Sequence, residues 1–218
     1  MTDNPSGGER LPVFNLRTIG PEPAGATPLE EEDLEGLIPD FVATRADLNQ
    51  VEFENIAKAV PWAERRVRSL DPHGILTAGF LTTLHKRMFG DVWRWAGTPR
   101  RRETNIGVDP SLIATQCRLF FDDAIYWHDH GVFGPDERAA RIHSRLVSIH
   151  PFPNGNGRCT RMMADLYMVA IGAVPFAWGS SDLDVDVDGS VRAAYLAAVI
   201  KAADTDDYAD LIRFARGA

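Results

Sequence analysis

The run that most constrains the fold is GRCTRMMADLYMVAIGAVP, residues 157–175. After its first turn this run is apolar nearly all round. A helix with apolar side chains on every side must be enclosed by other elements, because a surface helix keeps a polar face toward water. We therefore expect residues 157–175 to form a central buried helix, with the rest of the chain packed around it.

The segments on either side also favour helices. Their hydrophobic residues recur at near-helical spacing, and Gly or Pro marks several of the expected ends. The expected helical segments are 27–40, 44–67, 72–97, 111–131, 134–150, 189–205 and 207–217. Residues 98–110 instead combine turn residues with basic side chains, which suits a small exposed hairpin or an extended loop. The predicted fold class is therefore all-α, a helical bundle around one central helix, with a small β-hairpin.

The chain has 218 residues, of which 44% are apolar, so it is long enough for one domain with a sizeable core. Residues 1–28 are rich in Pro, Gly, Ser and Thr without a sustained period, which is typical of a flexible arm. We divide the remainder into an N-terminal helical segment, 29–60, and a domain core, 61–218.

Charge and cysteine usage limit the partners and the compartment. The formal net charge of −8 repels nucleic acid and anionic membranes, so we expect neither as a partner and any phosphate binding to be local. Cys117 and Cys159 lack the spacing of a metal or redox motif, which favours a reducing compartment. The sequence shows no secretion signal, and no apolar stretch approaches the roughly 20 residues of a membrane span. We therefore expect a cytoplasmic protein.

Residues 149–161 read IHPFPNGNGRCTR and lie between two expected helices. Gly155 and Gly157 let the backbone turn sharply and approach a ligand closely. The helix that follows begins with unpaired N–H groups and a positive dipole end, which together favour phosphate. Arg158 and Arg161 are three residues apart, so both point the same way and can hold further phosphate oxygens.

Two more side chains of this stretch complete a set of chemical parts. His150 lies at the mouth of the turn, and its pKa range suits proton abstraction near neutral pH. Asn154 offers an oxygen to a Mg²⁺ ion that a polyphosphate would bring. A base, an anion cradle and two cations suit attack on a nucleotide phosphate. Each part also has an ordinary structural use, because a Gly-x-Gly turn is often only a turn and a lone His at a helix end is often a cap.

The stretch HPFPNGNGRCTR resembles the signature of the Fic family, His-Pro-Phe-x-(Asp/Glu)-Gly-Asn-Gly-Arg-x-x-Arg. The matching positions are His150, Pro151, Phe152, Gly155, Asn156, Gly157, Arg158 and Arg161. The run LHKRMFGDVWRWAG, residues 84–97, is similar to the helix that precedes the family's flap. The resemblance covers roughly residues 45–215, and within the family the chain resembles the branch called mobile mystery protein B.

The resemblance implies a Fic-type helical bundle and transfer of AMP from ATP to a hydroxyl side chain of a target protein, a Tyr, Thr or Ser, with release of pyrophosphate. It implies that His150 deprotonates the hydroxyl. The implied nucleotide-binding residues are Gly155, Asn156 and Gly157 at the α-phosphate, with Arg158 and Arg161 at the β- and γ-phosphates. The implied cofactors are ATP, as substrate, and Mg²⁺. An antitoxin or another regulatory partner is also expected.

The resemblance further implies a flap, about residues 101–108, that binds the target's backbone as an extra strand. Its expected target-binding residues are Thr104, Asn105, Ile106 and Gly107, and Ile106 would clamp a side chain of the target.

Asn154 departs from the family pattern, which has Asp or Glu at the Mg²⁺ ligand. A neutral amide oxygen binds a hard cation more weakly than a carboxylate does. This departure predicts slow turnover, another metal preference or a related but different transfer.

Many Fic proteins carry an inhibitory helix with the pattern (Ser/Thr)-x-x-x-Glu-(Gly/Asn), whose glutamate pairs with the second arginine of the motif. QVEFEN, residues 50–55, resembles this pattern at Glu54-Asn55 but has Gln50 where Ser or Thr is expected. Glu54 is therefore the predicted inhibitory residue. Glu52 and Glu35 remain alternatives, as does the interpretation that all three are solvated helix charges.

The predicted function is a protein adenylyltransferase. One alternative is a kinase-like toxin in the manner of Doc, whose motif differs after the asparagine. A second alternative, to which Asn154 gives weight, is a nucleotide-binding regulatory module with weak or lost turnover.

Overall fold

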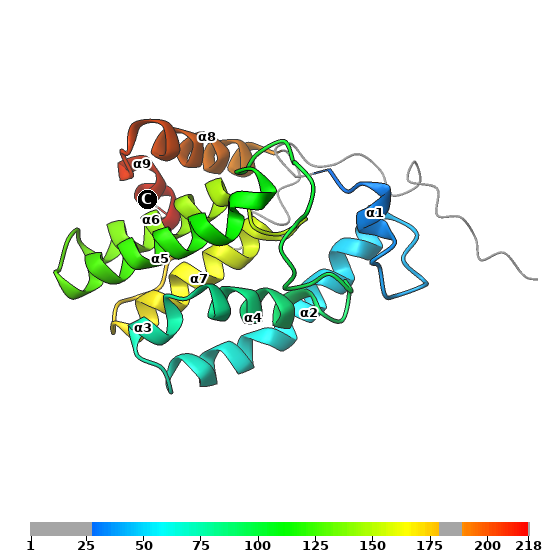
Figure 1. Ribbon diagram of the computed structural model, residues 1–218, viewed down its shortest axis with the longest axis horizontal. Helices are drawn as coiled ribbons and strands as arrows, with labels where there is room; N and C mark the ends of the chain where they lie inside the picture. Colours follow the sequence, from blue (N-terminus) through cyan, green and yellow to red (C-terminus); the bar gives the residue numbers. More distant parts are fainter. Residues whose placement is uncertain (1–27, 179–188, 218) are drawn as a thin grey trace, which may run out of the picture.

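The computed structural model describes residues 28–178 and 189–217 (Figure 1). The expected arm, 1–28, therefore lies outside the described residues except for Pro28. The described helices are α1 (Glu31–Leu34), α2 (Arg45–Val67), α3 (Pro72–Ile75), α4 (Ala78–Phe89), α5 (Ile113–Asp129), α6 (Pro135–Ile149), α7 (Asn156–Ala170), α8 (Ser190–Thr205) and α9 (Ala209–Arg216), with a short 3₁₀ turn at Pro110–Leu112.

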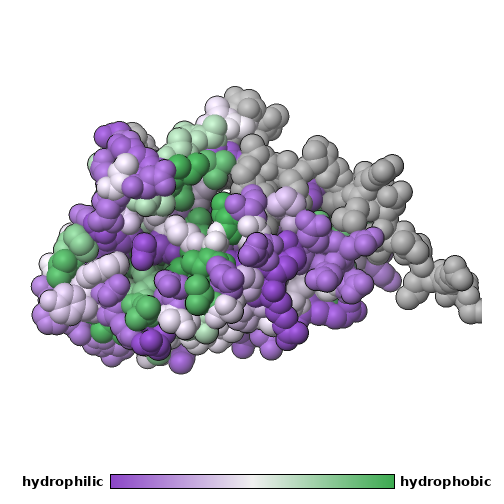
Figure 2. All heavy atoms as spheres, turned by 45° about the horizontal axis from the view of Figure 1, so that its top comes forward, coloured by the Kyte–Doolittle hydropathy of each residue, from purple (hydrophilic) through white to green (hydrophobic). Residues whose placement is uncertain are grey.

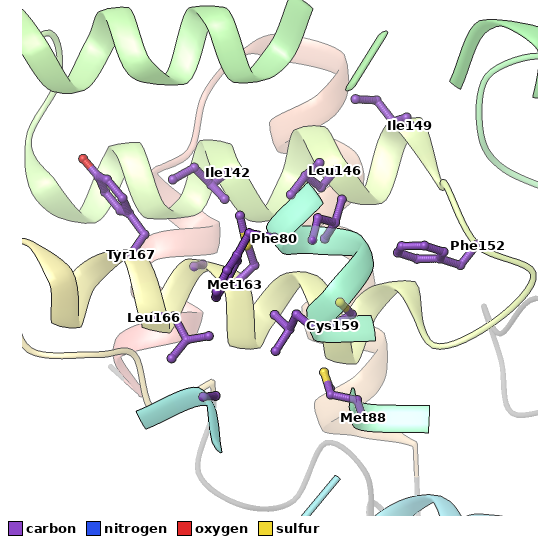
Figure 3. Packing of buried hydrophobic residues seen from close by; sticks show 14 of the residues in the cluster. Phe80, Met88, Ile142, Leu146, Ile149, Phe152, Cys159, Met163, Leu166 and Tyr167 are labelled. Atoms are coloured by element: carbon purple, nitrogen blue, oxygen red, sulfur yellow. The ribbon is translucent and has the colours of Figure 1, made fainter. Parts of the chain in front are cut away.

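Helix α7 is the central helix that the apolar run predicted. It packs against α2, α3, α4 and α6, and Figure 1 shows it in yellow between the α5–α6 layer and the α4–α2 layer. Cys159, Met163 and Tyr167 are fully buried along it. Figure 3 shows side chains of α4, α6 and α7 meeting in one apolar layer. Each such side chain contributes about 1.5–3 kcal/mol by leaving water, so this layer fixes the position of the first turn of α7.

Helix α2 runs unbroken through the segment expected at 44–67, even though Pro61 lies inside it. Thr44 begins the helix as a capping box with Asp47, each side chain bonding the other's backbone N–H. The buried face of α2 includes two polar residues, Glu52 and Asn55. The Asn55 side chain accepts from the Asp91 N–H at 2.9 Å, which ties α2 to the end of α4. Glu52 points toward α7 instead.

The single helix expected at 72–97 is in fact two helices and a turn. Leu76 leaves the helical conformation, with ψ at 60°, and Thr77 then caps α4 by accepting from the Phe80 N–H at 3.0 Å. The helix expected at 27–40 is only α1, because residues 36–38 pair instead with residues 92–94. The Ile38 N–H donates to the Val92 carbonyl at 2.8 Å.

The expected β-hairpin at residues 98–110 is not formed in the described chain, where the one β-bridge joins Leu37 to Trp93. The backbone N–H groups of the two legs donate to the end of α6 and the turn after it, and the legs are joined by the Arg100 side chain, whose Nη2 donates to the Val108 carbonyl at 2.5 Å. The Arg100 N–H donates to the Pro151 carbonyl at 2.9 Å, and the Val108 N–H donates to the Ile149 carbonyl at 3.3 Å. The flap is therefore an irregular loop fastened at both ends.

Candidate active site

His150 ends α6 in the left-handed conformation, with φ at 54° and ψ at 61°. This conformation is uncommon for a residue other than glycine. Its N–H donates to the Leu146 carbonyl at 3.0 Å, and its carbonyl accepts from Arg100 Nε at 2.6 Å. The imidazole is 4% exposed. The end of α6 and Arg100 therefore hold the ring in one place.

Asn156 closes the motif turn on itself. Its Oδ1 accepts from the Phe152 N–H at 2.9 Å, and its Nδ2 donates to the Phe152 carbonyl at 2.8 Å. Gly155 precedes α7 with φ at +77°, and a Cβ there would lie 2.7 Å from the Phe89 ring. Only glycine satisfies both the positive φ and this close approach.

The first turn of α7 leaves an anion cradle next to His150. The first helical bond runs from the Cys159 N–H to the Gly155 carbonyl, and no side chain caps the helix. The N–H groups of residues 156–158 therefore face outward at the positive end of the helix dipole, which favours an anion. A Cβ on Gly157 would meet only Tyr195 Oη, at 3.6 Å, and Arg161 Nη1, at 3.8 Å. The space beside Gly157 is thus open enough for a ligand.

The first motif arginine is already paired with a carboxylate. Arg158 Nη2 lies 2.8 Å from Glu52 Oε2, and the Trp93 indole donates to Glu52 Oε1 at 2.7 Å. The Glu52 side chain is 5% exposed, so both of its oxygens are satisfied away from water. Two arginines near a helix N-terminus are unfavourable without an anion, and Glu52 supplies one. Arg161 lies over the Tyr195 ring, 5.5 Å from its centre.

The carboxylate at this site is Glu52, whereas the sequence pattern favoured Glu54. Glu54 lies on the exposed face of α2 and accepts from Gln50 Nε2 at 2.8 Å. Residues two apart on a helix point about 200° from each other, so the two glutamates cannot share a face. Glu35 is also exposed, and its backbone carbonyl accepts from Arg94.

The flap residues lie beside the base. Gly107 has φ at +119°, and a Cβ there would lie 2.8 Å from His150 Cβ and 2.4 Å from Arg100 Nη2. Ile106 is 42% exposed, and its carbonyl accepts from Thr104 Oγ1 at 2.6 Å. Asn105 is exposed. All four predicted target-binding residues therefore belong to one short loop that reaches His150.

His85 supports the motif turn and was not predicted. Its Nδ1 accepts from the Gly97 N–H at 3.0 Å, so its Nε2 carries the proton and donates to the Asn154 carbonyl at 2.9 Å. The ring stacks on Phe152 with 3.8 Å between centres. Complete burial lowers the pKa of His85 to about 3, so the ring is neutral at pH 7. The sequence contains His85 within the quoted 84–97 run but carries no sign of its partners.

A second buried polar group, also not predicted, lies beneath α7. His143 is fully buried and bonds Thr160 Oγ1 through Nδ1 and Tyr195 Oη through Nε2, each at 2.9 Å. Burial, with a contribution from Arg161, holds the pKa of His143 well below its usual range. This network joins α6, α7 and α8 and places the Tyr195 hydroxyl near Gly157.

The electrostatics of His150 suit a base. Burial and, to a smaller extent, the charge of Arg100 lower its pKa to about 4, although a hydrogen bond with the Val147 backbone opposes the shift. The imidazole is therefore neutral at pH 7 and can accept a proton. A low pKa also makes it a weaker base than an ordinary His, so its efficiency depends on its position.

A divalent cation would find a single protein ligand here. Asn154 Oδ1 accepts from the Gly155 N–H at 2.5 Å, and an amide oxygen can serve as a cation ligand. The described residues contain no group of three or more His, Cys, Asp or Glu side chains that could hold a metal. The donors fit Mg²⁺ only in the way it binds polyphosphates, with phosphate oxygens and water completing the shell.

Comparison with known proteins bears directly on these residues. Residues 75–168 match the model of the Fic/DOC family. This part of the chain is similar to Fic domains. The match includes α4, the flap, α6 and the whole motif turn.

Individual relatives and solved structures agree with the match to the Fic/DOC family. The chain is 31% identical over 111 residues to the protein adenylyltransferase fic-1 of Caenorhabditis elegans, covering 47% of this chain and 21% of that protein. It is 31% identical over 90 residues to the uridine 5'-monophosphate transferase of Xanthomonas campestris, covering 34% and 17%. The chain thus spans about a fifth of the length of these relatives.

The fold of the chain is similar to that of the BepC protein of Bartonella tribocorum, which was crystallised with bound AMPPNP. The TM-score is 0.60 at 18% identity, covering 80% of this chain and 87% of that one. At this identity the likeness shows the fold. In the described part of the chain, no helix has the length and apolar character that crossing a membrane would require.

Proposed function

We propose that this chain transfers AMP from ATP to a hydroxyl side chain of a target protein. One observation carries the proposal: a buried, neutral His150 lies beside an uncapped helix N-terminus whose first two turns hold Arg158 and Arg161. The α-phosphate would bind the N–H groups of residues 156–158, and the arginines would neutralise the other phosphates. His150 would take the proton of the incoming hydroxyl as its oxygen attacks the α-phosphorus and pyrophosphate leaves.

A second donor is supported by one relative. The match to a uridine 5'-monophosphate transferase covers 90 residues, so the same phosphate chemistry with UTP is the second candidate. The cradle binds phosphates through backbone N–H groups and therefore does not itself distinguish the bases. The target with its Tyr, Thr or Ser acceptor, an antitoxin or regulatory partner, and the cytoplasmic location remain predictions.

Labelled nucleotides test the proposal. A lysate is incubated with the chain, Mg²⁺ and ATP labelled at either the α- or the γ-phosphate, and with α-labelled UTP in parallel. Protein label from α-labelled ATP alone supports AMP transfer. Label from γ-labelled ATP supports a kinase, label from UTP supports UMP transfer, and bound ATP without any protein label supports a regulatory module.

We propose further that Glu52 restrains the site by occupying Arg158, the first arginine of the motif, whereas the prediction was that Glu54 would pair with the second. The buried pair must separate before Arg158 can hold a phosphate, and this separation opposes nucleotide binding. Glu52→Gln keeps an acceptor for Trp93 but removes the charge. We expect ATP to bind about five- to 30-fold more tightly, corresponding to about 1–2 kcal/mol, as measured by calorimetry.

Glu54→Gln is the matched control for this variant, because it removes the same charge from the exposed face of the same helix. It should leave the dissociation constant of ATP unchanged. Equal affinities in wild type and Glu52→Gln would remove the proposed restraint, and a gain confined to Glu54→Gln would return the role to that residue.

Asn154 is expected to limit the use of Mg²⁺. Asn154→Asp replaces a neutral oxygen with a carboxylate at the position where the family has an acid, and hard cations prefer the charged ligand. We expect the variant to reach half of its maximal transfer rate at about a tenfold lower Mg²⁺ concentration. The measurement is a Mg²⁺ titration of transfer from α-labelled ATP. Superimposed titration curves for the two proteins would contradict the assignment.

A further inference from the structure

Three consecutive arginines lie at the start of the flap, and the structure gives each a different environment. Arg100 is buried and donates to the backbone carbonyls of the turn after α6. Arg101 is exposed. Arg102 points the other way and reaches the N-terminal segment, where it pairs with Asp33. The first arginine thus fastens the flap to the motif turn, and the third fastens it to a different part of the chain.

The partner of Arg102 is itself held firmly. The Asp33 side chain is 7% exposed, and its Oδ2 also accepts from the Glu30 N–H at 3.0 Å in the capping box of α1. Arg102 Nη2 lies 3.3 Å from the Pro28 carbonyl as well. Because the Asp33 carboxylate is buried and already hydrogen bonded, its oxygen is fixed in position. Little additional conformational entropy is therefore lost when the Arg102 guanidinium binds it.

The N-terminal strap, which we define as residues 28–38, is a rigid support for this contact. Its Asp33 carbonyl accepts from the Trp95 indole at 3.0 Å, and the Arg94 N–H donates to its Gly36 carbonyl at 2.8 Å. A Cβ on Gly36 would lie 2.4 Å from Trp95 Cδ1, so strap and tryptophan are in direct contact. The strap therefore moves with residues 92–95 and can anchor the flap.

The rest of the flap has few ties of its own. Within the described chain, the hydrogen bonds of residues 103–107 stay inside the loop: Thr104 Oγ1 donates to the Ile106 carbonyl, and Arg102 Nη1 donates to the Glu103 carbonyl. The backbone is also held near the start of this run, where the Arg102 carbonyl accepts from Arg100 Nη1 at 2.9 Å. The contact of the Arg102 side chain with Asp33 adds a second tie at the same point, to the N-terminal segment, and so lowers the number of conformations open to residues 103–107.

We propose that Arg102 is a positioning residue, which holds the target-binding flap in place through its ion pair with Asp33 of the strap. The effect of this ion pair on AMP transfer rests on the proposed function, because only a flap that receives a target needs a fixed position. A pre-ordered flap loses less entropy when it accepts a strand from a target. The effect of the ion pair on the order of the flap does not depend on any activity.

The test compares Asp33→Asn, Arg102→Gln and the double variant with wild type by ¹⁵N relaxation of the full chain. Wild type should show order parameters of about 0.8 at residues 103–107, and both single variants should fall below about 0.6. The double variant should fall no further, because either change alone breaks the pair. Glu32→Gln removes the same charge from an exposed neighbour of Asp33 and should match wild type.

A thermal melt of each variant checks that the fold is kept, and Arg102→Lys gives an intermediate case that retains the charge without the planar fork. Unchanged order parameters in both single variants, or an equal fall in Glu32→Gln, would overturn the proposal. In the transfer assay with α-labelled ATP, the single variants should label lysate proteins several-fold less while binding ATP as wild type does. Failure of all labelling would reject the proposed function while leaving the relaxation result intact.

Discussion

Replacing His150 by alanine is expected to lower the transfer rate by about 10²–10⁴-fold, the usual contribution of a positioned general base. The imidazole is the only titratable side chain predicted to touch the attacking hydroxyl, and the anion cradle cannot replace it because it contains only N–H donors. ATP should still bind with nearly unchanged affinity, since the cradle and the arginines remain. The measurement combines transfer from α-labelled ATP with calorimetry of ATP binding. A variant that transfers label at the wild-type rate would refute the role of His150.

The pH dependence gives an independent check on the same residue. The pKa of His150 is lowered to about 4, so the base is neutral above that value and becomes protonated as the pH falls through it. The loss of transfer rate in acid should therefore centre near pH 4 rather than near 6.5. A rate that halves around pH 6.5 would show that the imidazole titrates as an ordinary, solvated histidine.

Burial of His150 also links its ionisation to stability. Its folded-state pKa lies below the unfolded value of about 6.5, so the unfolded chain binds more protons between pH 6.5 and 4. The stability that the neutral ring allows is thus complete above pH 6.5 and is lost as the pH falls through that window. His85, with a pKa of about 3, acts in the same direction.

The second large effect is expected from Gly155→Ala. An alanine at φ of +77° costs about 1–2 kcal/mol, and its Cβ would lie 2.7 Å from the buried Phe89 ring, which adds about 1–3 kcal/mol of overpacking. We expect the free energy of unfolding to fall by about 2–5 kcal/mol in total, as measured by urea denaturation. Nucleotide binding should weaken as well, because the same glycine sets the start of α7.

Gly157→Ala is the matched control, two residues further along the same turn. Its Cβ would have no neighbour closer than 3.6 Å, so the free energy of unfolding should change by less than about 1 kcal/mol. ATP should nevertheless bind at least about tenfold more weakly, because a methyl group would occupy the space that the phosphate needs. The two glycines should thus separate into one required by the fold and one required by the ligand. Equal losses of stability in both variants would contradict this division.

Much of the fold could be predicted because its signals are local. The apolar run of residues 157–175 predicted the central helix, since a helix without a polar face has no stable place at the surface. The motif turn was also readable, because Gly155 and Gly157 have a backbone freedom that no other residue shares. His150, Asn156 and Arg158 then follow at fixed distances along the chain, so the turn brings them together wherever it is placed.

The features that sequence reasoning missed depend on contacts between distant segments. The sequence pattern favoured Glu54 over Glu52, and only the rotation of α2 against α4 and α7 turns Glu52 toward Arg158 and Trp93. The expected hairpin is not formed for a similar reason. Backbone groups of the flap legs bond to the Arg100 side chain, to the end of α6 and to the turn after it, and these bonds compete with backbone pairing between the legs.

By itself the sequence determined the elements and the chemistry of one turn, because helical period, glycine freedom and residue type act over a few neighbouring residues. Tertiary structure alone decided which carboxylate meets Arg158, which histidines become neutral supports, and that Asp33 anchors the flap. Those outcomes depend on burial and on the direction of side chains across packed helices. Neither quantity is defined until residues far apart in the chain share one core.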